Sequence, residues 1–379
     1  MTNPKIRVAV LYGGRSGEHE VSLQSAASII RYLDKAKFDI IPIGIDKTGR
    51  WHIAPPEALA LTGKSMQIYS SRPEVVLPSN PDALSTGLVN LADRSGMPSG
   101  GQFDVVLPAM HGTFGEDGAM QGLLELADVP YVGCGVLASA VGMDKDMAKR
   151  VLRDAGLPVV PWLCIRSGAW AAQQAQLEQR VAVDFGFPCF VKPANAGSSV
   201  GVHKVHQADE LVAAVNDALR YDTKVLVELA VIAREIELSV LENIQFGAEP
   251  LVSVAGEVVA THEFYSYEAK YLDENGASLH IPAQLSSQQM GAAQNMARRV
   301  FSALECEGLA RVDLFLEKSS GEFYVNEINT LPGFTSISMY PKMWEASGIQ
   351  YSELLTRLID LALARHQRKS KLLRDFKIG

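Results

Sequence analysis

The first third of the chain alternates short apolar runs with stretches of helical periodicity, and this alternation restricts the possible folds most. The apolar runs are IRVAVLY, FDIIPIGI and FDVVLPAM, and the helical stretches are HEVSLQSAASIIRYL and GAMQGLLELA. Strands alternating with helices of this length predict an open parallel α/β sheet. We therefore expect residues 1–134 to form one α/β domain. Scattered proline, serine and glycine over about 55–101 predict an irregular surface excursion within it.

The remainder of the chain divides into two blocks with different patterns. Residues 135–229 are predicted to form a small mixed unit that begins with one helix over 138–156. Residues 230–379 are predicted to be mostly strands, followed by helices at 290–304 and 351–365. The sequence contains no internal repeat and no low-complexity tract, so a solenoid or fibrous protein is excluded.

Composition and charge exclude several classes of protein. The 379 residues are 47% hydrophobic and 21% charged, which is ordinary for a globular protein of two or three domains. The formal net charge of −8 argues against a general nucleic-acid binder. The first apolar run is too short to span a bilayer and has no signal-cleavage pattern. We therefore expect no membrane association and a cytoplasmic location. The four cysteines form no CxxC pair, so we expect free thiols and no zinc site.

The stretch RVDLFLEKSSGEFYVNEIN, residues 311–329, is predicted to be a β-hairpin with polar groups on one face. With a five-residue loop at 318–322, the predicted pairs are Arg311 with Asn329, Asp313 with Glu327, and Phe315 with Val325. The residues predicted for the other face are Val312, Leu314, Leu316, Tyr324 and Ile328. One face of the hairpin thus carries an arginine, two carboxylates and an amide.

This polar face has the composition of a magnesium site. Two carboxylates that face each other repel by about 4 kcal/mol at ~4 Å and an effective dielectric near 20, unless a cation lies between them. Mg²⁺ is a hard cation that one or two carboxylates hold together with other oxygen ligands and substrate phosphates. Asp313, Glu327 and Asn329 supply such oxygens. Salt bridges to Arg311 are the alternative interpretation of this cluster.

Two glycine-rich turns follow strands, at the edge where open α/β sheets bind ligands. The turn GGRSGEHEVS contains Glu18, which suits a cation such as an ammonium, and a plain tight turn is the alternative. Its glycine spacing departs from the dinucleotide fingerprint. In the turn AMHGTFGEDGAMQG, His111 suits a substrate carboxylate, whereas Glu116 and Asp117 predict an N-terminal cap for the next helix.

The stretch FVKPANAGSSVGVHKV combines Lys192, at the end of an apolar strand, with a loop of small residues. Successive N–H groups and hydroxyls in such a loop can form an anion-binding nest. A lid over phosphates, with Lys192 reaching inward, and an ordinary exposed hairpin are both compatible with this pattern. It is not a P-loop, because GxxxxGK[ST] occurs nowhere in the sequence.

Taken together, these stretches resemble the D-alanine:D-alanine ligase family of the ATP-grasp superfamily, over nearly the whole chain. The motifs that carry the resemblance are IRVAVLYGGRSGEHEVSLQSA, HGTFGEDGAMQG, GMDKDMAKRVL, FVKPANAGSSVGV, YEAKY, RVDLFLE and VNEINTLPGFTSISMYP. The resemblance implies an open parallel α/β domain over 1–134, followed by a two-part α+β ATP-grasp fold. Its parts would be a central unit, 135–229, and a C-terminal catalytic unit, 230–379, with a lid loop at about 262–282.

The resemblance also implies an ATP site between the central and C-terminal units. The residues implied to contact ATP are Lys145, Phe190, Lys192, Ser199, Glu228, Leu229, Val231, Glu235 and Phe315. Two Mg²⁺ or Mn²⁺ ions would be held by Asp313, Glu327 and Asn329. The segment departs from the family at Ala233, where a glycine is common, and this leaves the backbone path near Val231 open.

The implied reaction joins two D-alanines through a D-alanyl phosphate, for peptidoglycan precursor synthesis. Glu18 would hold the ammonium group of the first substrate, with His111 near its carboxylate. The oxyanion of the second step would be stabilised by Arg311 and the N–H of Gly333. The residues implied to orient and bind the second substrate are Ser198, Tyr271, Lys270, Ser338 and Met339.

Several alternatives remain at this point. A ligase with D-lactate or D-serine as second substrate is the nearest, although Tyr271 favours D-alanine because ester-forming relatives lack this tyrosine. A nucleotide-dependent oxidoreductase would need the dinucleotide fingerprint that is absent. A non-catalytic ATP-binding module would be expected to have lost part of the polar hairpin face. The implied partners are D-alanine, ATP and a second copy of the chain in a homodimer, with no nucleic acid.

Overall fold

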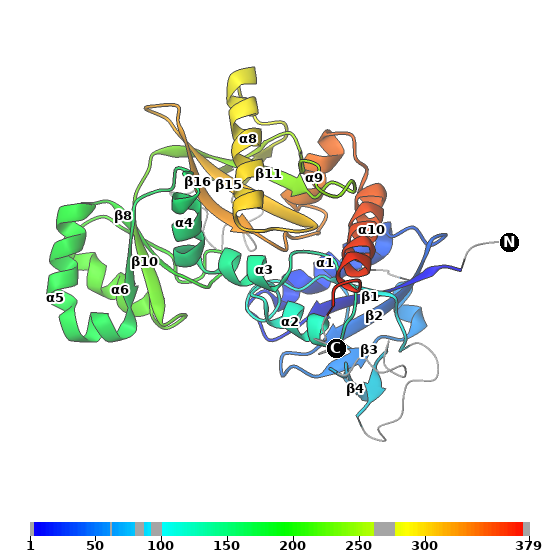
Figure 1. Ribbon diagram of the computed structural model, residues 1–379. Coiled ribbons are helices and arrows are strands. Elements are labelled where there is room, and N and C mark those ends of the chain that lie inside the picture. The colour runs from blue at the N-terminus through cyan, green and yellow to red at the C-terminus, as the bar shows by residue number, and fades with distance from the viewer. Residues whose placement is uncertain (1–3, 61–62, 80–86, 92–100, 261–276, 374–379) are drawn as a thin grey trace, which may run out of the picture.

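The computed structural model describes residues 4–60, 63–79, 87–91, 101–260 and 277–373, and the fold is given for these residues. Three sheets follow one another along the chain, and each has helices packed on it (Figure 1). Within the described part, no helix is both long and apolar enough to cross a membrane.

The first sheet has the strand order β5-β4-β3-β2-β1-β6. Three of its strands pair in parallel, as predicted: β1 (Ile6–Gly13), β2 (Phe38–Ile45) and β6 (Val105–Pro108). Three antiparallel strands extend one edge: β3 (Trp51–Ile53), β4 (Glu74–Val76) and β5 (Val89–Asn90). The excursion over 55–101 is therefore not wholly irregular, because it adds β4, β5 and the 3₁₀ turn η1 (Pro56–Leu59). Unpaired backbone groups at a sheet edge favour such additions.

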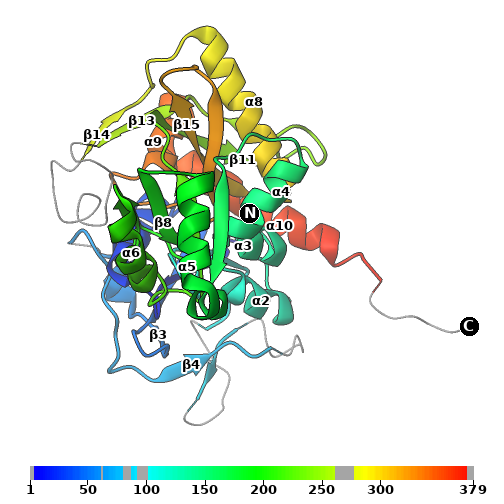
Figure 2. The same ribbon diagram turned by 90° about the vertical axis from the view of Figure 1, so that its left-hand side faces the viewer.

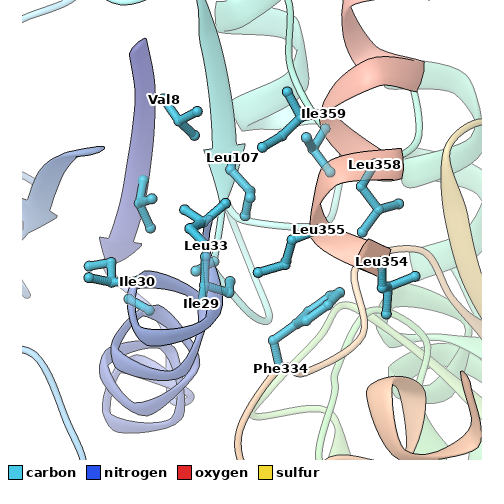
Figure 3. Close-up of a cluster of buried hydrophobic side chains, with 14 of the residues drawn as sticks. Val8, Ile29, Ile30, Leu33, Leu107, Phe334, Leu354, Leu355, Leu358 and Ile359 are labelled. Carbon is cyan, nitrogen blue, oxygen red and sulfur yellow. The ribbon is translucent and has the colours of Figure 1, made fainter. Parts of the chain in front are cut away.

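Both faces of the parallel part of this sheet are buried, which explains why β1, β2 and β6 are mostly apolar. On one face, Val8 and Leu107 pack against α1 (His19–Tyr32) and the C-terminal helix α10 (Tyr351–Lys369), as Figure 3 shows. On the other face, the β1 residues Ala9 and Leu11 share a core with α2 (Ala119–Leu126). The last helix of the chain therefore completes the core of the first sheet.

The second sheet is antiparallel, with the order β7-β10-β8-β9. Its strands are β7 (Trp162–Arg166), β8 (Cys189–Pro193), β9 (His203–Val205) and β10 (Lys224–Leu229). Three helical segments accompany it: α5 (Ser167–Asp184), η2 (Ala208–Glu210) and α6 (Leu211–Ala218). α5 and α6 bury one face of the sheet in a single apolar cluster (Figure 2), which leaves the opposite face available for a site.

The single helix predicted over 138–156 is wrong, because two helices occupy this stretch: α3 (Val136–Met143) and α4 (Lys145–Asp154). Asp144 lies between them in an extended conformation, and its side chain accepts a hydrogen bond from the Met147 N–H at 3.0 Å. An aspartate in this position starts a new helix by satisfying an N–H that has no partner within it. The break brings the first turn of α4 to the loop after β8, where the Lys145 N–H donates to the Ala194 carbonyl at 3.0 Å.

The third sheet has the order β14-β13-β11-β15-β16, with β12 paired to β11. Its strands are β11 (Ala233–Leu241), β12 (Leu251–Val252), β13 (Gly256–Ala260), β14 (Ala277–His280), β15 (Leu309–Glu317) and β16 (Phe323–Asn329). Helix α8 (Ser287–Ala303) packs on one face, and α9 (Met339–Ala346) follows β16. The lid loop predicted at about 262–282 is wrong at its end, because β14 occupies part of it; residues 261–276 lie outside the described part.

The hairpin of β15 and β16 has the predicted register in one half only. Arg311 faces Asn329 and Asp313 faces Glu327, as predicted. A β-bulge after Asp313 then shifts the register, so that Phe315 faces Tyr324 rather than Val325. The extra residue moves Tyr324 off the core face, where the buried residues are Val312, Leu314, Leu316, Phe323, Val325 and Ile328. Bulges of this kind re-aim side chains near sites.

We predict that Asp144→Ala lowers the free energy of unfolding by about 1–2 kcal/mol, because the α4 cap is lost. It should also raise the KM for the ATP that the family resemblance implies, since α4 begins at Lys145, which lines a cavity. Urea unfolding and steady-state kinetics measure the two effects. Ser286→Ala is the matched control: it removes the cap on the Gln289 N–H of α8 and should cost stability without changing the KM. Equal KM changes in both variants would contradict this role of the α4 cap.

Candidate active site

One cavity of about 360 Å³ is lined by residues from all three sheets and their loops. Every predicted site residue that the structure describes lines it. These residues are Glu18, His111, Lys145, Phe190, Lys192, Ser198, Ser199, Glu228, Leu229, Val231, Glu235, Arg311, Asp313, Phe315, Glu327, Asn329, Gly333, Ser338 and Met339. Lys270 and Tyr271 lie outside the described residues. Segments that are far apart in the sequence thus converge on one place.

Glu18 lines the cavity and is contacted by two loops from different sheets. Its Oε1 accepts a hydrogen bond from the Ser198 hydroxyl. A Cβ atom at Gly112 or at Gly197 would lie only 2.7 Å from Glu18 Oε2, so a larger residue in either loop would displace this carboxylate. Ser198 and Ser199 both have positive φ, 51° and 59°. Residues other than glycine rarely adopt this backbone conformation, and it is often found at functional sites.

The turn that carries Glu18 is also fixed by close backbone packing. A Cβ at Gly13, where φ is 89°, would lie 2.1 Å from the Ile45 carbonyl oxygen. The Gly13 N–H donates to Ser22 Oγ at 2.7 Å, and that hydroxyl donates to the Ala109 carbonyl at 2.6 Å. The turn is therefore tight, as one interpretation of the sequence held, and it also brings Glu18 to the cavity.

His111 is buried beside this turn. Its Nε2 lies 2.8 Å from Ser25 Oγ, and Ser25 Oγ accepts the Phe334 N–H at 3.3 Å. Burial lowers the pKa of His111, although the nearby Glu18 carboxylate acts in the opposite direction. The imidazole is therefore neutral near pH 7 and can donate or accept one hydrogen bond at each nitrogen.

Two lysines share one buried carboxylate between the second sheet and α4. Lys192 Nζ lies 2.7 Å from Glu228 Oε2, and Lys149 Nζ lies 3.1 Å from Glu228 Oε1. Burial alone would raise the pKa of Glu228, but the two ammonium groups outweigh it and hold that pKa below its ordinary value. Glu228 is thus a carboxylate with two cationic neighbours, one of which lines the cavity.

Arg311 has the reverse arrangement, one cation between two carboxylates. Its Nε and Nη2 donate to both oxygens of Asp313, at 2.8 and 2.7 Å. Its Nε also lies 3.1 Å from Glu237 Oε2. Burial would lower the pKa of Arg311, but Asp313 and Glu237 raise it well above its ordinary value. The salt bridges considered for this cluster therefore exist in the structure.

The predicted metal ligands are placed on one face of the third sheet, within reach of a lysine. Glu327 Oε2 lies 3.4 Å from Lys145 Nζ, which also donates to the Ala196 carbonyl at 2.8 Å. Asn329 Oδ1 accepts the Leu331 N–H at 3.0 Å. Two carboxylates and an amide oxygen are the ligand types that a hard divalent cation such as Mg²⁺ takes. Among the described residues, no group of three or more His, Cys, Asp or Glu side chains could hold a metal by itself.

A helix start and two aromatic residues belong to the cavity lining. Ser338 is the N-cap of α9 and Met339 is its first residue, and both line the cavity. A helix start suits an anion. Glu235 lies opposite Phe315 in the third sheet, and Phe190 lies opposite Glu228 in the second. Phe190 and Phe315 thus bring aromatic rings from two sheets to one cavity, which suits a flat ring.

Family models match most of the chain. The model described as D-ala D-ala ligase N-terminus matches residues 7–134, and the model described as D-ala D-ala ligase C-terminus matches residues 151–360. The chain belongs to the D-alanine:D-alanine ligase family. It is therefore a ligase with an ATP-grasp fold, and ATP is a substrate of the family.

Relatives and solved structures cover nearly the whole chain. D-alanine--D-alanine ligase A of Bradyrhizobium diazoefficiens is 53% identical over 375 residues, covering 98% of this chain and 99% of the relative. The D-alanine--D-alanine ligase of Heliobacterium modesticaldum is 49% identical, with 97% of each chain covered. The solved D-alanine-D-alanine ligase from Coxiella burnetii has a TM-score of 0.79 and 38% identity, covering 98% of this chain and 97% of its own. The VanG D-Ala:D-Ser ligase from Enterococcus faecalis has a TM-score of 0.80 and 34% identity, covering 95% and 100%.

Three charged residues of this ligase-family site were missed by the sequence analysis. Lys149 follows Lys145 by four residues, a spacing that places both on one face of a helix. Glu237 follows Glu235 by two residues in a strand, which places both on one face of the sheet. These spacings were the available signals. Glu116 carried no such signal, because a helix-cap role explained it.

The cap interpretation is wrong for Glu116, and Asp117 lies one residue before the N-cap of α2, which is Gly118. Asp117 still accepts the N–H of Ala119, the first residue of α2, at 3.0 Å. Glu116 instead turns back to accept the Gly112 N–H at 2.7 Å, and it lines the cavity. Burial, with a further contribution from the Glu18 charge, raises the pKa of Glu116 to about 8. Glu116 thus supports the loop that carries His111 and is protonated at neutral pH.

We predict that Glu116 makes stability fall as pH rises. The ordinary pKa is 4.5 and the folded value is about 8, so between these values the folded state holds a proton that the unfolded state has lost. The free energy of unfolding then decreases with pH across this window. Glu116→Gln keeps an acceptor for Gly112 but cannot titrate, and its stability should fall less from pH 5 to 8 in urea unfolding. Parallel curves for the two proteins would contradict the raised pKa.

Proposed function

We propose that this chain joins two D-alanine molecules to D-alanyl-D-alanine, with cleavage of ATP to ADP and phosphate, for peptidoglycan precursor synthesis. The observation that carries this proposal is the single cavity lined by all nineteen described residues that the family motifs predicted, taken with 53% identity to a D-alanine--D-alanine ligase. Charge, aromatic walls and a helix start are each present where such a reaction needs them.

In this proposal ATP lies between the second and third sheets. Phe190 and Phe315 border the adenine, Glu228, Leu229 and Val231 lie at its edge, and Glu235 binds the ribose hydroxyls. Lys145, Lys192 and the loop with Ser199 contact the phosphates. Both lysines have carboxylate partners in the structure, Glu327 at 3.4 Å and Glu228 at 2.7 Å. Phosphate binding thus replaces one anionic partner by another, without leaving a lysine uncompensated.

The first step transfers the terminal phosphoryl group to the carboxylate of the first D-alanine, which creates a good leaving group. Glu18 holds the ammonium of that substrate, and neutral His111 lies at its carboxylate end. Two Mg²⁺ or Mn²⁺ ions, held by Asp313, Glu327 and Asn329, would neutralise charge on the phosphates. The carboxylate that is phosphorylated needs no protein base.

In the second step, the amine of the second D-alanine attacks the acyl phosphate. Arg311 and the Gly333 N–H stabilise the oxyanion, and loss of one such donor typically costs about 10²- to 10³-fold in rate. Ser198, hydrogen-bonded to Glu18, orients the attacking amine together with Tyr271. The carboxylate of the second D-alanine is bound by Lys270, Ser338 and the N–H of Met339. The start of α9 at Met339 supports this role, because a helix start suits an anion.

The second substrate separates this proposal from its nearest rival. One structural neighbour is a D-Ala:D-Ser ligase at 34% identity, whereas the relatives at 49–53% identity are D-alanine--D-alanine ligases. The greater identity favours D-alanine. A homodimer, a cytoplasmic location, the number of metal ions and domain boundaries at residues 134 and 229 remain predictions.

We predict that the purified chain with ATP, Mg²⁺ and equal D-alanine, D-lactate and D-serine forms D-alanyl-D-alanine as the main product. Chromatography with mass detection identifies the product, and a coupled assay follows ADP. ADP release should require both Mg²⁺ and D-alanine. A main product containing D-lactate or D-serine would overturn the substrate assignment.

We further predict that Asp313→Ala and Glu327→Ala each abolish turnover while thermal melting remains cooperative. The loss should exceed the roughly 10- to 100-fold that follows from removing a residue that only orients a metal ligand. Glu317→Ala is the matched control, because Glu317 ends the same strand β15 and does not line the cavity. It should turn over at the rate of the unaltered chain. Near-normal activity of both first variants would show that the hairpin holds no essential metal.

A further inference from the structure

The arrangement around Arg311 presents a conflict that the proposed function has to resolve. Both oxygens of Asp313 accept hydrogen bonds from the Arg311 guanidinium, at 2.8 and 2.7 Å. Metal binding needs the Asp313 carboxylate, and the oxyanion step needs the Arg311 guanidinium. A metal ion and a guanidinium compete for the same carboxylate, because both are cations and both bind its oxygens.

Glu237 is the second carboxylate in contact with Arg311. Its Oε2 lies 3.1 Å from Arg311 Nε, and it faces Asp313 directly in the pairing of β11 with β15. Its side chain is 12% exposed, the same fraction as that of Asp313. Glu237 lines the cavity, and no role for it followed from the family motifs.

We propose that Glu237 is a positioning residue that retains the Arg311 guanidinium in the cavity when the Asp313 carboxylate turns to the metal. The inference rests on the proposed function, since it takes the metal and oxyanion roles from it. Arg311 then keeps one of its two anionic partners, Glu237, when the other is taken. Asp313 becomes available to the metal at lower cost, because a buried guanidinium left without a counter-charge would be strongly unfavourable.

Glu237 is one of three carboxylates that neighbouring strands place in a row. Glu237, Asp313 and Glu327 occupy one row across β11, β15 and β16. Like charges facing each other across strands are unfavourable, so this row requires cations beside it. Arg311 and Lys145 supply them in the structure. An amide at position 237 would fill the same space but would not supply a charge to replace that of Asp313.

Two measurements on Glu237→Gln test the proposal. The first is Mn²⁺ binding in the presence of ADP, followed through the paramagnetic resonance signal of unbound Mn²⁺, without catalysis. We expect affinity to fall by about 10-fold or more, the usual effect of removing a group that positions a metal ligand. The second compares hydroxylamine-trapped D-alanyl phosphate with dipeptide at saturating Mn²⁺. Trapping should approach the rate of the unaltered chain, while dipeptide formation stays about 10-fold slower, because Arg311 is less well held.

Glu257→Gln is the matched control. Glu257 makes an ion pair with Arg234 through two hydrogen bonds of 2.7 Å, on β13 of the same sheet, and neither residue lines the cavity. Mn²⁺ affinity and both rates should equal those of the unaltered chain. If Glu237→Gln does not fold, Glu237→Asp takes its place: it keeps the charge but withdraws it from Arg311, and a smaller loss of Mn²⁺ affinity is expected.

The outcomes separate this inference from the proposed function. Unchanged Mn²⁺ affinity in the folded position-237 variant would overturn the role of Glu237, whatever the activity. Equal losses in trapping and in dipeptide formation at saturating Mn²⁺ would also overturn it, because Arg311 is needed only in the second step. Absence of both products from the unaltered chain would instead refute the proposed function, and the Mn²⁺ measurement would still stand.

Discussion

The structure depends on bringing charges of both signs together in and beside one partly buried cavity, where two central charges each have two partners of opposite sign. Arg311 is paired with Asp313 and Glu237, and Glu228 is paired with Lys149 and Lys192. Removing ions from water costs more than a single ion pair usually returns, so these groups are not where the fold gains its stability. The stability comes from apolar clusters on the far faces of the sheets, which α8, α5 and α6 complete.

Close approach of loops from different sheets is the second constraint. Glu18 belongs to the first sheet, Ser198 to the loop of the second, and Gly112 to the loop after β6. The glycines let these loops approach Glu18 closely. α10 packs on the first sheet together with Phe334, which lies in the loop between β16 and α9 (Figure 3). These contacts join sheets that are built from separate parts of the sequence.

Four residues of the site could be predicted from the sequence because strand periodicity places alternate residues on one face, whereas most of the others were implied by the family resemblance. That rule brought Arg311, Asp313, Glu327 and Asn329 together correctly. The rule failed after Asp313, because a bulge adds a residue there that strand periodicity does not predict. It also could not show that Asp144 divides one helical stretch into two, since a helix pattern continues on both sides. Long-range packing, such as that of α10 on the first sheet, depends on shape complementarity that a single sequence does not display.

Each of the two charge clusters has one central charge with two partners of opposite sign: the central charge is negative at Glu228 and positive at Arg311. Glu228 has two ammonium neighbours, of which only Lys192 lines the cavity; Lys149 is 2% exposed behind it. In the proposed function a phosphate takes Lys192, and Lys149 would still neutralise Glu228. Around Arg311 the same logic holds with two carboxylates, Asp313 and Glu237. In both clusters a ligand can take one partner of a central charge while the second partner remains, which avoids the large cost of an isolated buried charge. A site built in this way can exchange ligands through successive steps while its central charges keep their positions.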